Sequence, residues 1–238
     1  MYYAVAIVII LIVLFFLFAI RGRVGNKNLS TLQGFNYAHR GLHGNGVAEN
    51  SMTAFLQAKE KGYGIELDIH LLKDGSLAVI HDNLLVRTTG ADGFVEDLTK
   101  EELENYALEN TNDTIPSFEE VLNLYDGAAP LIVELKPHKN NQAALAKAAA
   151  DILKDYNGAY CIESFDPRCI WWLKKNRPEI IRGQLSQNFF KSKDKLNVII
   201  KFLLTNNLLN FITKPDFVAY NFNHRNNIST VFCKKMDN

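Results

Sequence analysis

The sequence predicts an α/β protein whose strands close into a (β/α)8 barrel. Short apolar segments typical of strands alternate with amphipathic segments typical of helices, and this order favours a parallel sheet. The predicted strands also carry charged residues on one face. Strands of an open sheet covered by helices on both faces are apolar throughout, whereas barrel strands bring polar residues to a rim at their carboxyl ends. The charged strand ends therefore favour the barrel.

Seven segments have the length and composition of strands, and capping residues separate them. The strands are expected at residues 35–39, 64–70, 77–81, 131–136, 159–165, 180–185 and 217–222. Helices are expected to begin where a capping residue precedes an amphipathic segment, at Asn50 or Ser51, Thr99, Ser117 and Asp166. Two more helices are expected within residues 196–209 and 226–235. The connection from residue 83 to 116 is long for such a fold, and loops of that length tend to be functional.

Composition limits the classes of function. The 238 residues fit one domain, and the 26 acidic residues balance the 26 basic ones. A neutral chain lacks the basic surface that binds nucleic acid, so no nucleic-acid partner is expected. The three cysteines, Cys161, Cys169 and Cys233, are an odd number without metal-ligand spacing, which indicates reduced thiols.

The N-terminus departs from a globular composition. Residues 2–20 contain no charged side chain, and as a helix they would span roughly 28 Å, close to the hydrocarbon core of a bilayer. We therefore expect a transmembrane anchor over residues 1–22 and membrane association through residues 2–20. Arg21, Arg23 and Lys27 follow this segment, and the positive-inside tendency then predicts a single-pass protein with its main domain in the cytoplasm.

Two alternatives to the anchor remain open, a cleaved signal peptide and a buried core helix. A signal peptide is less favoured because the segment has no basic n-region, a long apolar run and no small residues suited to cleavage. Residues 23–34, rich in Gly, Asn and Ser, are expected to form a linker to a domain over residues 35–238.

Two carboxylates stand two residues apart on one predicted strand. Strand alternation turns Glu66 and Asp68 to the same face, and Glu134 ends the next long strand. A salt bridge to a nearby Lys or Arg is the structural alternative for the first pair. Three carboxylates without cysteine suit a hard cation such as Mg²⁺ or Ca²⁺ better than Zn²⁺.

Cations and imidazoles also stand at strand ends. Arg40 and Lys136 beside a metal would suit an anionic group such as phosphate. His39 and His81 can act as general base and general acid in a reaction at phosphorus. Each residue alone is weak evidence, but a barrel brings successive strand ends to one mouth, which favours an active site.

These residues resemble the glycerophosphodiester phosphodiesterase family, within the phospholipase-C-like phosphodiesterases. The resemblance runs from about residue 36 to about residue 222. The matching motifs, in order, are Ala38-His39-Arg40-Gly41, Glu49-Asn50-Ser51, Ile65-Glu66-Leu67-Asp68, Lys73-Asp74-Gly75, Val79-Ile80-His81-Asp82, Arg87-Thr88-Thr89-Gly90, Ile115-Pro116-Ser117-Phe118-Glu119-Glu120 and Glu134-Leu135-Lys136.

The resemblance implies a (β/α)8 barrel with a small insertion after its third strand, and a function in lipid metabolism. It implies hydrolysis of glycerophosphodiesters to glycerol 3-phosphate and an alcohol, dependent on Mg²⁺ or Ca²⁺. It further implies roles for nine residues: Glu66, Asp68 and Glu134 as metal ligands, His39 and His81 as the acid/base pair, Arg40 and Lys136 as phosphate ligands, and Glu49 and Asn50 near the substrate.

The sequence departs from the family pattern near its end. No eighth strand follows the predicted helix at residues 226–235, so the barrel is expected to lack its last strand and helix. Two other functions stay open. One is a lysophospholipase-D-like phosphodiesterase that acts on acylated lipids, for which the anchor would hold the site near lipid. The other is an inactive barrel, left by loss of the last strand, that serves as a binding or scaffold protein.

Overall fold

The computed structural model describes residues 2–193 and 195–236. Four residues within the predicted anchor and domain, Met1, Asp194, Asp237 and Asn238, lie outside this described part. The strands are β1 (Tyr37–His39), β2 (Gly64–Leu71), β3 (Leu77–Val79), β4 (Leu131–Leu135), β5 (Tyr160–Ser164), β6 (Arg182–Ser186) and β7 (Phe217–Tyr220). The α-helices are α1 (Tyr2–Ala19), α2 (Met52–Glu60), α3 (Val86–Thr89), α4 (Phe118–Tyr125), α5 (Gln142–Leu153), α6 (Pro167–Asn176), α7 (Val198–Thr205), α8 (Asn210–Thr213) and α9 (Ile228–Met236).

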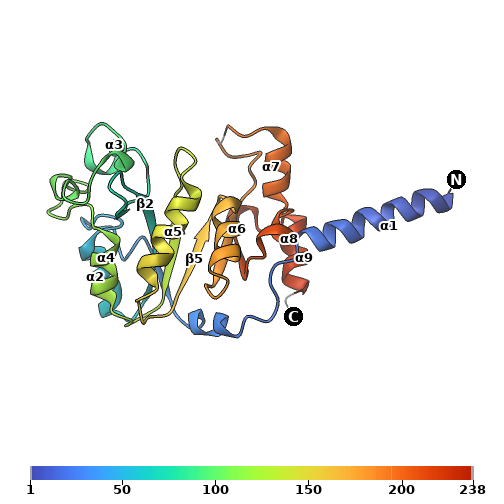
Figure 1. Cartoon of the computed structure of the whole chain (residues 1–238), viewed down its shortest axis with the longest axis horizontal. Coiled ribbons are helices and arrows are strands. Elements are labelled where there is room, and N and C mark those ends of the chain that lie inside the picture. Colours follow the sequence, from blue (N-terminus) through green and yellow to red (C-terminus); the bar gives the residue numbers. More distant parts are fainter. Residues whose placement is uncertain (1, 194, 237–238) are drawn as a thin grey trace.

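One curled sheet organises the chain (Figure 1). Its parallel strands follow the order β1-β2-β4-β5-β6-β7, and β3 pairs with β2 outside this path. Each of the seven predicted strands is present. Among the described residues β7 does not pair with β1, so the sheet forms an open part of a barrel.

The prediction that the third strand belongs to the barrel is wrong. β3 runs antiparallel to β2, with Ile69 opposite Val79 and Leu71 opposite Leu77. Residues 72–76 join the two strands, and so short a connection permits only a hairpin because a parallel crossover needs about a dozen residues. The insertion therefore follows the second parallel strand, and the described sheet has two parallel strands fewer than a closed eight-stranded barrel.

The main core lies between the sheet and a layer of helices. Ile65, Leu67 and Ile69 of β2 are fully buried in this core, together with residues of α2, α4, α5 and α6. Alternation along β2 turns the residues between them, Glu66 and Asp68, to the opposite face. The core thereby fixes the face on which the polar residues stand.

Three of the four helix starts predicted from capping residues are confirmed. Ser51 caps α2, Ser117 and Glu120 form a reciprocal capping box at α4, and Asp166 caps α6 with proline at the first helical position. The helix predicted after Thr99 is wrong. Only a 3₁₀ turn, Leu103–Asn105, forms there, because Leu103 alone is buried and a longer helix lacks an apolar face to hold it.

The insertion, residues 72–116, has a small core of its own. α3 and the 3₁₀ turns Val95–Asp97 and Leu103–Asn105 surround buried residues that include Leu85 and Leu108. This packing holds the insertion against the sheet, although the insertion contains no long helix or strand among its described residues. His81 therefore stands on an ordered loop.

α1 projects from the body of the molecule, as Figure 1 shows. Its 18 residues have a mean hydropathy of 3.0, and 6% of them are buried, which contradicts the alternative of a buried core helix. By length and composition α1 can cross a membrane, and a signal sequence shares these properties. The expected helices near residues 196–209 and 226–235 are present as α7 and α9, and a further 3₁₀ turn is Phe222–His224.

The segment after α1 is attached to the body. Arg23 forms an ion pair with Asp216 and its backbone N–H donates to the Pro215 carbonyl at 2.8 Å. The Asn26 side chain donates to the same aspartate at 2.8 Å. A 3₁₀ turn, Lys27–Leu32, continues the chain to β1. Residues 23–26 are thus held in place by side-chain contacts.

Candidate active site

Three buried carboxylates meet on one face of the neighbouring strands β2 and β4. Glu66 and Asp68 extend from β2 and Glu134 extends from β4, with Asp68 and Glu134 paired in register. One ligand atom from each lies within 4.8 Å of the others. The structure therefore brings together the three carboxylates that the sequence singled out.

Burial and mutual repulsion make this cluster electrostatically costly. Burial, with the charges of Asp68, Glu134 and Glu163, raises the pKa of Glu66 to about 9. Burial also raises the pKa of Glu134 to about 7. Burial alone would raise the pKa of Asp68, but the charge of Lys136 and a hydrogen bond from Asn50 bring it below its usual value. The cluster thus favours the addition of positive charge.

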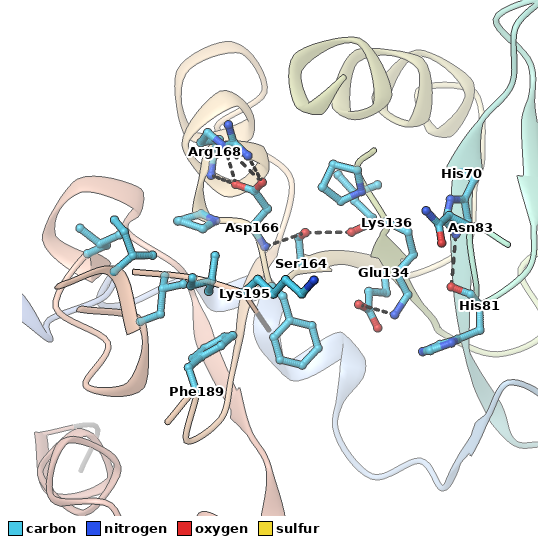
Figure 2. A pocket seen from close by; sticks show the side chains of 18 of the residues that line it. His70, His81, Asn83, Glu134, Lys136, Ser164, Asp166, Arg168, Phe189 and Lys195 are labelled. Carbon is cyan, nitrogen blue, oxygen red and sulfur yellow. Dashed lines mark hydrogen bonds and ion pairs between the residues drawn. The ribbon is translucent and has the colours of Figure 1, made fainter. Parts of the chain in front are cut away.

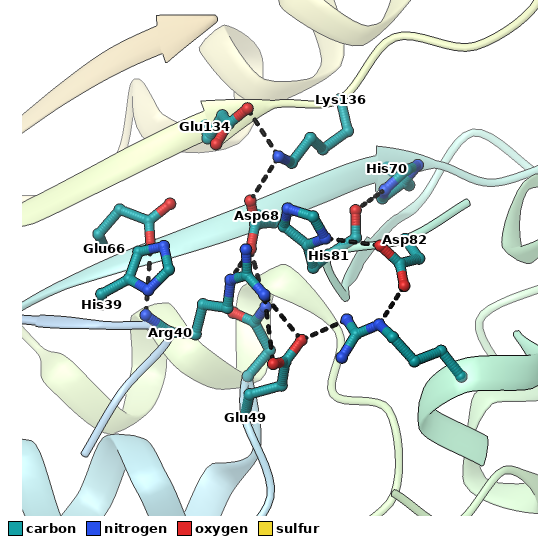
Figure 3. A network of polar contacts seen from close by, with 12 residues as sticks. His39, Arg40, Glu49, Glu66, Asp68, His70, His81, Asp82, Glu134 and Lys136 are labelled. Carbon is teal, nitrogen blue, oxygen red and sulfur yellow. Dashed lines mark hydrogen bonds and ion pairs between the residues drawn. The ribbon is translucent and has the colours of Figure 1, made fainter. Parts of the chain in front are cut away.

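Lys136 supplies one positive charge between two of the carboxylates (Figure 3). Its Nζ lies 2.7 Å from Oε1 of Glu134 and 3.0 Å from Oδ1 of Asp68. Apart from this ion pair, the buried Oδ1 of Asp68 has no hydrogen-bond donor among the described residues. One lysine charge shared by two carboxylates, with a third carboxylate beside them, fits the oxygen-rich coordination of Mg²⁺ or Ca²⁺.

Arg40 lies at a tight turn after β1. Its backbone adopts a left-handed φ of 56°, and its N–H donates to Oε2 of Glu66 at 3.1 Å. The next residue, Gly41, has a φ of 78°, and a Cβ there would lie 2.8 Å from that of Ala54. The turn therefore needs glycine. The Arg40 guanidinium lies 3.1 Å from Glu49 and 3.5 Å from Asp68.

Glu49 and Asn50 approach the carboxylates from the loop before α2. Asn50 has a left-handed φ of 52° and donates from Nδ2 to Oδ2 of Asp68 at 2.9 Å. Glu49 accepts hydrogen bonds from Arg40 and, at 2.5 Å, from Arg87. These arginines hold the pKa of Glu49 below its usual value although burial would raise it.

The two imidazoles reach the site from different segments. His39 ends β1, where its Nε2 lies 3.8 Å from Glu66 and its side chain is 67% exposed. His81 belongs to the insertion, and its Nδ1 lies 2.6 Å from Oδ1 of Asp82. Burial lowers the pKa of both, and the neighbouring cations Arg40 for His39 and Lys136 for His81 lower it further. Both rings thus favour the neutral form.

Arg87, which the sequence analysis named only within the motif Arg87-Thr88-Thr89-Gly90 and gave no role, connects two parts of the site. Its guanidinium forms ion pairs with Asp82 and Glu49, so it joins the imidazole of His81 to the loop that carries Arg40.

Two other buried groups lie beside these residues. Nδ1 of His70 lies 2.7 Å from Glu96, and its Nε2 lies 3.2 Å from the backbone carbonyl of His81. His70 therefore helps to hold the backbone of His81 in place. Glu163 of β5 pairs in register with Glu134, and burial raises its pKa to about 8. The alternation of the predicted strand at residues 159–165 would have placed Glu163 on the site face.

A cavity of about 880 Å³ opens beside the carboxylates. Its polar end is lined by His81, Glu134 and Lys136, and Figure 2 shows Phe189 on the opposite side. The far wall is formed largely by apolar residues: Phe165, Phe189, Leu196, Ile200, Leu204 and Leu209. The cavity therefore has a charged end and an apolar end.

Known proteins are similar to this chain in sequence and in fold. A curated glycerophosphodiester phosphodiesterase from Bacillus altitudinis is 45% identical over 107 residues, which are 42% of this chain and 43% of that protein. Another from Caldanaerobacter subterraneus subsp. tengcongensis is 36% identical over 160 residues, 63% of this chain and 65% of that protein. The alignment thus spans less than two thirds of either relative.

A solved structure is also similar. An Oleispira antarctica phosphodiesterase in complex with the product sn-glycerol-3-phosphate superposes with a TM-score of 0.62 at 26% identity, covering 74% of this chain and 72% of that one. The model of the glycerophosphoryl diester phosphodiesterase family matches residues 39–237. That match includes every residue of the site described above, so the chain belongs to the glycerophosphoryl diester phosphodiesterase family.

Proposed function

We propose that this protein is a divalent-cation-dependent phosphodiesterase that hydrolyses glycerophosphodiesters to glycerol 3-phosphate and an alcohol. The observation that carries the proposal is the cluster of Glu66, Asp68 and Glu134, buried at one rim beside two cations and two imidazoles. The family and the product bound to the Oleispira antarctica relative support the same substrate class.

The three carboxylates would hold the cation. Bound Mg²⁺ or Ca²⁺ would supply Lewis-acid polarisation of a phosphoryl oxygen. Arg40 and Lys136 would bind the phosphate, because each already places a nitrogen within 3.5 Å of Asp68 at the centre of the cluster. Glu49 and Asn50 would orient Arg40 and Asp68 through the hydrogen bonds described above.

His39 and His81 would move the protons. A neutral imidazole can accept the proton of the attacking hydroxyl, and its partner, protonated beside the phosphate anion, can donate to the leaving alcohol. Asp82 fixes the ring of His81 through Nδ1 and leaves Nε2 for the substrate. The exposure of His39 suits it to the side of the departing alcohol.

The membrane arrangement is part of the proposal. Residues 1–22 would anchor the chain by a single span, residues 23–34 would link it to the domain at residues 35–238, and the positive-inside tendency would place that domain in the cytoplasm. The mass of the protein recovered from membranes tests this arrangement. An intact N-terminus supports an anchor, whereas a chain shortened near residue 20 identifies a signal peptide.

Glycerol 3-phosphate release tests the activity. The full chain in detergent would be assayed with glycerophosphocholine and glycerophosphoethanolamine, with Mg²⁺, with Ca²⁺ and with chelator. Glu66→Gln and His81→Ala would abolish release, and Glu60→Gln, an exposed carboxylate of α2, is the matched control. A folded protein that releases no product under any condition contradicts the proposal and favours a binding or scaffold role.

A further inference from the structure

α7 has two apolar faces, and only one of them belongs to the protein interior. Ile200 and Leu204 line the cavity. On the other face Val198, Ile199 and Phe202 are 70%, 71% and 53% exposed. We call these three residues the α7 ridge. Soluble surfaces rarely leave large aliphatic and aromatic side chains so exposed on neighbouring turns of one helix.

The ridge stands on the side of the body from which α1 leaves. Figure 1 shows α7 on this side, with its axis running across that of α1. Leu203 of α7 packs against the buried cluster that Ala19 and Ile20, at the end of α1, form with Leu208. If α1 crosses a bilayer, α7 therefore lies close to the plane of the membrane surface.

Contacts on both sides of this junction keep α1 and the body in one orientation. Asn210 of α8 donates to the Ile20 carbonyl at 3.0 Å, and the Phe18 and Phe211 rings lie 5.4 Å apart. Arg23 is paired with the fully buried side chain of Asp216. The helix that spans the membrane and the helix that carries the ridge are thus held to each other through α8 and the start of the linker.

Charge supports a lipid surface as the occupant. The chain as a whole is neutral, yet residues 187–236 contain seven lysines and one arginine against two aspartates. Lys191, Lys193 and Lys195 are exposed in the segment just before α7, and Lys201 lies within the helix. Exposed apolar residues flanked by lysines are typical of helices that lie in the headgroup layer of anionic membranes.

The same helix forms a wall of the active-site cavity. Its inner residues, with Phe189 and Leu196, make the apolar end, whereas His81 and Lys136 lie at the charged end. A glycerophosphodiester without acyl chains has nothing to bury in the apolar end. A monoacyl glycerophosphodiester would place its phosphate at the charged end and its chain against α7.

We propose that α7 is a membrane-contact helix that rests in the headgroup layer of an anionic bilayer and through which a monoacyl glycerophosphodiester enters the cavity from the lipid. Only the entry of the substrate from the lipid rests on the proposed phosphodiesterase activity. The contact between the ridge and lipid is independent of that activity, and the two halves are measured separately.

A spin label tests the contact. Ile199→Cys in a Cys233→Ser background would carry the label in the full chain, reconstituted in vesicles of phosphatidylcholine and phosphatidylglycerol. Leu56→Cys is the matched control, because Leu56 is exposed to 43% on α2 at the opposite end of the body in Figure 1. The label at 199 should be accessible to oxygen and protected from a water-soluble nickel chelate, and the control should show the reverse.

Equal nickel accessibility at both positions overturns the contact. Protection at position 199 could also persist in detergent without lipid, together with cross-links between copies of the chain. This result would assign the α7 ridge to a second copy and would overturn the contact with lipid. Loss of the protection in pure phosphatidylcholine vesicles would confirm the contribution of the lysines.

Turnover tests the route of the substrate. Ile199→Gln with Phe202→Gln, neither of which lines the cavity, should lower turnover of lysophosphatidylcholine in vesicles roughly tenfold or more. Turnover of water-soluble glycerophosphocholine should stay unchanged, and Leu56→Gln should change neither. An equal loss with both substrates overturns the route. Absence of turnover with either substrate in the parent contradicts the phosphodiesterase activity and the route together, while the label still reports the contact.

Discussion

His81 and Asp82 are adjacent in the chain and bonded to each other, with Nδ1 of the histidine 2.6 Å from a carboxylate oxygen of the aspartate. The other oxygen of Asp82 is paired with Arg87, which also contacts Glu49. The imidazole is therefore oriented by a chain of charges that ends at Arg40. Residues outside the immediate cluster of carboxylates thus determine how the His81 ring is oriented in the cavity.

Asp82→Asn should reduce activity and move its pH dependence. The hydrogen bond to Asp82 raises the pKa of His81 against the effect of burial, so its weakening lowers that pKa further. The acid limb of the profile of kcat/KM should shift to lower pH. Turnover should fall by on the order of tenfold to a hundredfold. This is part of the rate enhancement of about 10²–10⁴-fold that a positioned general acid or base supplies. Asp97→Asn, in the same insertion, is the control, and an unshifted profile would show that Asp82 does not orient His81.

Glu66→Gln should make the protein inactive yet more stable. The variant loses one of three proposed cation ligands, and turnover with Mg²⁺ should fall by at least about a hundredfold. Without cation it also removes a buried carboxylate whose pKa is raised to about 9, so the free energy of unfolding at neutral pH should rise by about 1–3 kcal/mol. Urea denaturation in chelator measures this change. A loss of stability in chelator would contradict the repulsion inferred here.

Stability without cation should fall as the pH rises. The pKa of Glu66 is raised from 4.5 to about 9, and that of Glu163 from 4.5 to about 8. Between these values the folded protein binds more protons than the unfolded chain, so each such group lowers the free energy of unfolding by about 1.4 kcal/mol per pH unit. The fall should begin near pH 4.5 and end near pH 9. Saturating Mg²⁺ should reduce it, and a stability that is flat with pH in chelator would count against the buried cluster.

Lys136→Met should destabilise the protein and abolish turnover. The side chain is buried between Asp68 and Glu134, and its loss leaves their charges uncompensated at a cost of about 3–5 kcal/mol in chelator. The phosphate would also lose a ligand. Lys147→Met is the control, because Lys147 pairs with Asp151 on the exposed face of α5. Thermal denaturation with and without Mg²⁺ separates the two effects, and equal stability of both variants would contradict the role of Lys136.

The residues of the site were predictable because strand alternation is a local property. The spacing of Glu66 and Asp68 places them on one face of β2, because the buried aliphatic residues that alternate with them, Ile65, Leu67 and Ile69, occupy the other. The apolar pattern of β3 does not predict its direction, because the pattern is the same in a parallel and an antiparallel strand. The length of the connection does predict it, since five residues are too few to return a parallel strand.

Contacts between distant segments were not predictable from such patterns. Arg87 meets Glu49 across 38 positions of the sequence, and Arg23 meets Asp216 across 193. Neither pair has a periodicity or a spacing that one sequence can reveal. The capping pattern at Thr99 failed for a related reason, because a cap can start a helix but only packing against the rest of the fold extends it.

The insertion that carries His81 is joined to the sheet by β3 and has its own small core. A segment of this kind can open as a cooperative unit while the parallel strands remain intact. In its opened state the protein would keep its three carboxylates on β2 and β4 but lose an imidazole. If His81 has the proposed role, a local folding equilibrium would set the fraction of competent molecules, and heat or denaturant would remove activity before the sheet unfolds.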